Sequence, residues 1–396
     1  MSNYLEGSLK LEEWQEKLMT KKIAIFTWLH NGNYGSVLQA FALQRFLIDH
    51  EFNAINFDYD ASLKTKLINW WKNKNSPNLF LKKIVDAKGK RSYPRPELFE
   101  KREKKFFDFK KENMQLTNLY RTPKEVADAA KEYEIFICGS DQIWSPALMN
   151  PVYYLDLVPD TSVKVAYAPS FGVIKMPDAK KRQISGYLKT FKYLSVREKQ
   201  GQALVKELIN KDIPVQVDPT MLISREMWAK YAGKRLIEGR YIFCYLLTPN
   251  PAYIEAVKKL SRRRGIPVVI VPTSKGPFKT GFSEHVDVGP LDWVNYIHNA
   301  ELVCTDSFHG CIFSAIFEKD FILFKRFSDA DKNSENSRIY TLTELLGVEH
   351  RLIDINNMDS LDNLKPINFD YIRETIERES EKSRKWLLDI LEKECG

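Results

Sequence analysis

The chain has 396 residues, of which 44% are hydrophobic and 28% are charged. These proportions exclude a disordered protein, and the length suits two domains better than one core. No apolar run approaches the roughly 18 residues that a membrane-spanning helix requires. The acidic N-terminus also lacks the apolar stretch of a secretory signal, so we expect a soluble, cytoplasmic protein.

The net charge of +8 is concentrated in one segment of the chain. Residues 61–112 contain sixteen Lys and Arg against six Asp and Glu, which leaves the remainder close to neutral. In residues 63–83, Trp70 and Trp71 lie among lysines, a combination that suits a helix on the inner face of the cell membrane. The alternative to membrane contact is that the aromatic side chains of this segment pack on the first domain while its lysines face solvent. The second half of the segment favours packing, through Phe99, Phe106, Phe107 and Phe109. Because no nucleic-acid-binding module is present, we expect no nucleic-acid partner.

The cysteines and histidines predict no metal site. Five cysteines are scattered without a CxxC pair, and six histidines show no ligand spacing. We therefore expect reduced thiols and neither a bound metal nor a cofactor.

The first half of the chain is typical of a parallel α/β protein. A strand is expected at 22–29, followed by a polar, glycine-bearing loop and a helix from Ser36 to His50. The later strands of this series are expected at 53–59, 134–139, 164–170, 193–198 and 214–219, with helices at 178–190 and 199–209.

A second series of the same kind begins after a break near 225–240. Its strands are expected at 241–247, 267–272, 285–289, 301–306 and 321–325, and its helices at 252–264, 291–300 and 308–318. We predict an N-terminal domain 1–232, which carries the basic helical segment 61–112, and a C-terminal domain 233–365. A long helix within 366–396 could cross back to the first domain. The predicted fold is α/β, with two Rossmann-like doubly wound domains facing a cleft.

Four loops that follow strong strands carry unusual polar content. They span residues 31–36, 139–144, 195–198 and 305–310. In doubly wound folds the ligand lies beyond the carboxyl ends of the strands, where such loops meet. The substrate-binding candidates from these loops are Asn33, Tyr34, Gly35, Ser140, Gln142, Asp306 and Ser307.

His309 is the most informative of these loop residues, because it occupies the first turn of a helix. A helix N-terminus attracts anions, and a histidine there can bind phosphate or donate a proton. The alternative is a structural histidine that is hydrogen-bonded to a carboxylate such as Asp306.

Arg197 and Asp141 are the other two catalytic candidates. Arg197 could bind a carboxylate or phosphate through two hydrogen bonds of its planar guanidinium group, or it could form a salt bridge to Glu198 or to a neighbouring acid. Asp141 and Gln142 could orient substrate hydroxyls, or could belong to a turn and helix cap.

The ordered motifs together resemble the polysaccharide pyruvyl transferase family. They are GNYGSVLQAFAL, CGSDQIWSP, YLSVRE, VDPTMLI, GPLDWVNYIHNAELVCTDSFHGCIFSAIF and NSRI. The resemblance spans about residues 22–353. It implies a GT-B-like fold, phosphoenolpyruvate as donor, and a sugar diol of a surface polysaccharide, such as a capsule or exopolysaccharide, as acceptor. The product is a cyclic pyruvate ketal.

The resemblance carries the family's histidine onto His309 and its arginine onto Arg197. A further cation for phosphate could be Lys325, Arg326, Lys332 or Arg338, and the motifs do not decide among them. Pyruvyl transfer requires an acid, fixed cations and a base, for which His309, Arg197 and Asp141 are the candidates.

The acceptor is expected to be lipid-linked or nucleotide-linked. Two other functions stay open: a GT-B-type nucleotide-sugar glycosyltransferase, since fold does not determine chemistry, and a non-catalytic binding protein of a polysaccharide locus.

Overall fold

A computed structural model describes residues 21–60, 96–248, 250–273, 280–329, 331 and 334–395. The segment 63–83, for which membrane contact was expected, and Lys332 lie outside the described residues.

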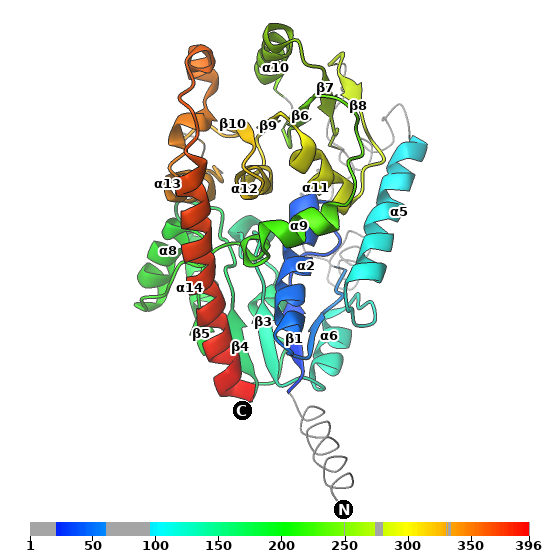
Figure 1. The fold of residues 1–396 in the computed structure, drawn as a ribbon. Helices are drawn as coiled ribbons and strands as arrows, with labels where there is room; N and C mark the ends of the chain where they lie inside the picture. The colour runs from blue at the N-terminus through cyan, green and yellow to red at the C-terminus, as the bar shows by residue number, and fades with distance from the viewer. Residues whose placement is uncertain are drawn as a thin grey trace, which may run out of the picture.

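The first half of the chain forms a five-stranded parallel sheet in the order β2-β1-β3-β4-β5 (Figure 1). Its strands are β1 (Ile23–Phe26), β2 (Ala54–Asn56), β3 (Ile135–Cys138), β4 (Val163–Ala166) and β5 (Tyr193–Leu194). Its helices are α2 (Tyr34–Asp49), α5 (Pro96–Asn113), α6 (Pro123–Ala130), α7 (Asp178–Leu188) and α8 (Lys199–Ile209). In register, Ile23 of β1 is paired with Ala54 of β2 and with Ile135 of β3.

The second half forms a six-stranded parallel sheet in the order β11-β10-β9-β6-β7-β8. Its strands are β6 (Ile242–Tyr245), β7 (Val268–Ile270), β8 (Ser283–Glu284), β9 (Leu302–Thr305), β10 (Asp320–Phe324) and β11 (Leu352–Ile353). Its helices are α9 (Arg225–Ala232), α10 (Pro251–Arg264), α11 (Pro290–Asn299), α12 (Phe308–Ile316) and α13 (Ser337–Leu346). Together the two sheets confirm the predicted α/β class.

The strand sequences explain why helices cover both faces of each sheet. β1, β3 and β9 read IAIF, IFIC and LVCT, and every residue in them is buried. A parallel strand that is apolar on both faces must be packed between two layers of helices. The strand order reverses between β1 and β3 in one sheet and between β6 and β9 in the other. Ligands of doubly wound folds bind at such reversal points.

The last helix, α14 (Phe369–Cys395), runs from the second sheet to the first along one side of the molecule (Figure 1). The Ser380 hydroxyl donates a hydrogen bond of 2.7 Å to the Met221 carbonyl. At its far end Glu394 accepts hydrogen bonds from Lys192 and Tyr193, beside β5. One hydrophobic cluster contains residues of both sheets, so the core does not divide the chain into separate domains. The domain boundaries expected at residues 232 and 365 therefore stay predictions.

Two expected strands were wrong. Residues 214–219 form a single isolated bridge, Val196 with Val215. The backbone N–H of Val217 donates to the Ser383 hydroxyl instead, because the chain here has left the sheet to meet α14. The strand expected at 285–289 lies earlier, as β8, and β11 was not predicted.

On α5 the expected aromatic packing is present for Phe106 and Phe109, which are buried, whereas Phe99 is half-buried and Phe107 is 61% exposed. Among the helices that the structure describes, none has the length and apolar character to cross a membrane.

Candidate active site

The N-termini of α2 and α12 meet between the two sheets. Asn33 caps α2 by accepting a hydrogen bond of 2.9 Å from the Gly35 N–H, and Ser307 caps α12 by accepting one of 3.3 Å from the Gly310 N–H. A Cβ atom on Gly35 would lie 2.0 Å from the Nδ1 atom of His309. The imidazole therefore packs directly on the backbone of α2, which requires glycine at position 35.

Arg197 and His309 meet at a buried carboxylate, that of Asp218. Arg197 Nη1 donates a hydrogen bond of 2.6 Å to Asp218 Oδ2. His309 Nε2 lies 3.3 Å from the same oxygen, an ion-pair distance when the imidazole is protonated. The structure thus brings together these two catalytic candidates, from opposite halves of the chain.

Local hydrogen bonds fix the orientation of Asp218. Its Oδ1 atom accepts from the backbone N–H and the hydroxyl of Thr220, at 3.1 and 2.8 Å, and Ser140 donates to Oδ2 at 3.2 Å. Burial alone would raise the pKa of Asp218. The charges of His309 and Arg197 and the hydrogen bonds outweigh burial and hold the pKa well below its usual range. Asp218 is therefore a carboxylate throughout the neutral pH range.

Three buried donors around this carboxylate have no hydrogen-bond partner in the part of the chain that the structure describes. They are Nε and Nη2 of Arg197 and Nε of Arg338. The Arg197 and Arg338 guanidinium carbons lie 4.3 and 5.8 Å from the centre of the Phe308 ring. Buried polar groups in proteins are normally satisfied, so an anionic ligand could use these donors.

Asp141 completes the buried network on the side of α2. It accepts hydrogen bonds from the Ser36 hydroxyl and from the Gln142 backbone N–H, and its Oδ1 atom lies 3.7 Å from Arg197 Nη2. Its φ of 73° places it in the left-handed region, which costs free energy and is common at functional sites. The Gln142 amide packs on Gly172, where a Cβ would lie 2.2 Å from Nε2.

The carboxylate that His309 and Arg197 meet is Asp218, and neither Asp306 nor Glu198 takes that place. Asp306 accepts hydrogen bonds from the Leu247 and Thr248 N–H groups, at 2.6 and 2.9 Å, and so holds the loop after β6. Burial raises the pKa of Asp306 to about 6, opposed by the charge of Arg326. Glu198 accepts from the Phe171 N–H at 3.0 Å, not from Arg197.

Two predicted substrate-binding residues lie away from the cluster. Tyr34 is buried against Trp293, with ring centres 5.4 Å apart, and donates to the Val288 carbonyl. Tyr34 therefore joins the two halves of the molecule. Lys325 pairs with Asp329 at 2.5 Å and with Asp354 at 3.3 Å. Of the three candidate cations after β10 that the structure describes, it is Arg338 that lies with Arg197 at the Phe308 ring.

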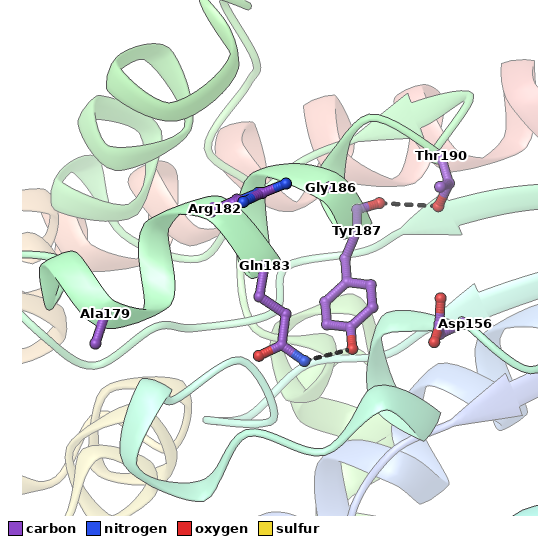
Figure 2. A pocket seen from close by; sticks show the side chains of 7 residues that line it. All are labelled: Asp156, Ala179, Arg182, Gln183, Gly186, Tyr187 and Thr190. Carbon is purple, nitrogen blue, oxygen red and sulfur yellow. Dashed lines mark hydrogen bonds between the residues drawn. The ribbon is translucent and has the colours of Figure 1, made fainter.

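A cavity of about 520 Å³ on α7 does not belong to this cluster (Figure 2). Gln183 donates to the Tyr187 hydroxyl at 2.9 Å, and the Thr190 hydroxyl donates to the Tyr187 carbonyl at 2.8 Å. Several of its polar groups thus already pair with one another, and none of the predicted site residues lines it.

The sequence model of one protein family, described as polysaccharide pyruvyl transferase, matches residues 33–329. The chain belongs to this family. Membership supports a transferase that modifies polysaccharides. The matched region contains Arg197, Asp218 and His309, whereas Arg338 and α14 follow it. No curated protein sequence is significantly similar to the chain.

Solved structures of low sequence identity share the fold of this pyruvyl transferase family member. A UDP-N-acetylglucosamine 2-epimerase from Rickettsia bellii is 8% identical and has a TM-score of 0.53, covering 94% of this chain and 97% of its own. The wall teichoic acid polymerase TagF is 12% identical with a TM-score of 0.51, over 96% of this chain and 90% of its own. These likenesses agree with a GT-B-like arrangement of two doubly wound halves.

Asp218 was not among the predicted site residues. It lies in the motif VDPTMLI, which was among the matching motifs, and the contacts that mark it as a site residue are made only in the folded protein. In the part of the chain that the structure describes, no three His, Cys, Asp or Glu side chains gather as a metal site would require.

Proposed function

We propose that this protein transfers the pyruvyl group of phosphoenolpyruvate to two hydroxyls of a sugar and releases inorganic phosphate. The observation that carries the proposal is the buried meeting of Arg197 and His309 at Asp218, with unpaired donors around it. Phosphoenolpyruvate carries a carboxylate and a phosphate. A guanidinium group can bind either of them through two parallel N–H···O hydrogen bonds.

In the proposed mechanism the His309 imidazolium gives a proton to the methylene carbon of phosphoenolpyruvate. The double bond supplies the electron pair for the new C–H bond, and C2 becomes an oxocarbenium-like centre. One sugar hydroxyl adds to C2, then a second displaces phosphate and closes the ketal. Of the two hydroxyl protons, one restores the imidazolium and the other leaves with phosphate.

Asp218 and Arg197 support this step electrostatically. Asp218 lies 3.3 Å from Nε2 of His309, and Arg197, fixed by Asp218, is preorganised for negative charge on the substrate. Asp141 is the candidate base for a sugar hydroxyl, because it is a buried carboxylate in the same network. No step requires a metal or another cofactor.

The test is phosphate release from phosphoenolpyruvate with a panel of lipid-linked and nucleotide-linked sugars. In D₂O each product should carry one deuterium in its ketal methyl group, because the acid delivers a solvent-derived proton there. Glycosyl transfer from a nucleotide sugar without phosphate release would identify the glycosyltransferase alternative instead. Ligand binding with no turnover of any donor would favour the non-catalytic alternative.

A lipid-linked acceptor would bring the protein to the inner face of the cell membrane. We keep peripheral membrane contact through residues 63–83 as a proposal from the sequence alone, because they lie outside the described residues. Co-sedimentation with anionic vesicles that is lost when Trp70 and Trp71 become Ser would support it, and failure to co-sediment at low salt would exclude it.

A further inference from the structure

A cavity of about 540 Å³ opens between α8, α13 and α14, next to the Arg197–Asp218 pair. All three helices lie on the same side of the molecule (Figure 1). Its volume lies within the range of small-molecule sites in proteins. Arg197, Asp218, Phe308 and Arg338 line its inner part, so the cavity is continuous with the candidate active site.

The inner end of the cavity is built from two buried guanidinium groups. Arg197 and Arg338 are only 4% and 7% exposed, and three of their nitrogen atoms have no hydrogen-bond partner among the described residues. Arg197 pairs with Asp218 at 2.6 Å and lies 3.7 Å from Asp141, and Arg338 pairs with Glu335 at 3.2 Å. Burial lowers the pKa of Arg338; the charge of Glu335 opposes this effect, and the positive charges of Arg197 and Arg326 add to it. Buried N–H groups without a hydrogen bond are costly, and an anion bound between the two guanidinium groups would satisfy them.

The outer end carries further cations on α8 and α14. Lys199 pairs with Glu344 at 2.6 Å, while Arg378 and Lys382 share Glu379 at 2.9 and 2.7 Å. The charged residues that line the cavity are thus five cations against three carboxylates, Asp218, Glu344 and Glu379. This excess of positive charge would attract an anionic ligand towards the buried arginines.

We propose that this cavity binds a phosphate-bearing small molecule, with its phosphate or carboxylate on Arg197 and Arg338 and with Arg378 and Lys382 at the entrance. The inference deepens the proposed function, on which it rests for the identity of the ligand. Two sources share the chemistry: the phosphate of phosphoenolpyruvate, and the diphosphate of a nucleotide-linked acceptor. In either case, α14 would form one wall of the substrate site.

The test is direct titration of phosphoenolpyruvate, inorganic phosphate and UDP into the full-length protein by calorimetry, without turnover. Arg338→Gln should weaken binding about tenfold or more, since a hydrogen bond to a charged group is removed. Lys382→Gln should weaken it about threefold, and less at high salt, because Lys382 is exposed. The matched control is Lys385→Gln, exposed on the same helix and not part of the cavity lining, which should bind as the wild type does.

The outcomes separate this inference from the proposed function. Weaker binding of phosphoenolpyruvate in both variants assigns the cavity to the donor, and weaker binding of UDP alone assigns it to the acceptor diphosphate. Either result holds even if no ketal is ever formed. If Lys382→Gln and a folded Arg338→Gln protein bind all three ligands as tightly as the wild type, the inference is overturned, whether or not the enzyme makes a ketal. Should Arg338→Gln fail to fold, the comparison of Lys382→Gln with Lys385→Gln decides alone.

Discussion

Gly35→Ala should inactivate the enzyme although the substitution favours the helix that carries it. Alanine is up to about 1 kcal/mol better than glycine inside a helix, so the sequence alone would predict a neutral or stabilising change. In the structure the new Cβ would lie 2.0, 2.3 and 2.7 Å from the Nδ1, Cγ and Cε1 atoms of His309.

The size of the displacement follows from these distances. Ordinary contacts begin at 3.4 Å, so the imidazole must retreat by about 1.4 Å. The ring is 5% exposed and packed in the protein interior, so it cannot retreat without shifting away from Asp218 or disturbing its neighbours. A catalytic group misplaced by about 1 Å can lose on the order of 10²-fold in rate. We therefore expect kcat to fall by about that factor.

Gly186→Ala is the matched control. Gly186 lies in α7 and is exposed, and a Cβ there would meet nothing within 4 Å. This variant should keep wild-type kinetics and gain up to about 1 kcal/mol in the free energy of unfolding. The assay is phosphate release with the acceptor that supports the wild type, alongside circular dichroism and thermal unfolding of both variants. If a folded Gly35→Ala protein had the same kcat as Gly186→Ala, the prediction would be wrong, because the position of the His309 ring on α2 would then not determine the rate.

Four further predictions concern His309 as the acid, Arg197 as the substrate-binding cation, the need for a metal cofactor, and the pH dependence of stability. His309→Ala should keep the fold and lose at least about 10²–10⁴-fold in transfer rate, and near-normal turnover would refute its role as the acid. Arg197→Lys should raise the KM for phosphoenolpyruvate, because lysine keeps the positive charge but cannot form two parallel hydrogen bonds as the planar guanidinium group does. Unchanged KM and kcat would show that the ion pair of Arg197 has only a structural role. Activity should survive EDTA, and a loss that a divalent ion restores would contradict this. Because burial raises the pKa of Asp306 to about 6, its ionisation opposes folding, and its own contribution to the free energy of unfolding should fall as pH rises from about 4 to 6. Denaturant titrations should show that the free energy of unfolding of Asp306→Asn, relative to that of the wild type, increases over this pH range, and a constant difference between the two proteins would contradict the assignment.

Local patterns in the sequence were sufficient for the fold class and for most of the elements. Apolar strands such as IAIF and IFIC can only be buried between helices, and their alternation with helical stretches predicts parallel sheets. The expected strand at 214–219 failed because a segment that packs between a sheet and a helix such as α14 also needs apolar residues. No local signal separates that case from a strand.

The sequence by itself also selected Arg197, His309 and Asp141, because polar residues after parallel strands gather at one edge of a sheet. Only the tertiary structure decided which partners they have. Asp218 joins Arg197 to His309, Asp306 holds a backbone loop instead of the histidine, and Arg338 reaches the cluster while Lys325 pairs elsewhere. These contacts link residues far apart in the chain, and their distances depend on how the two sheets and α14 pack together. Residue type and spacing do not contain that information.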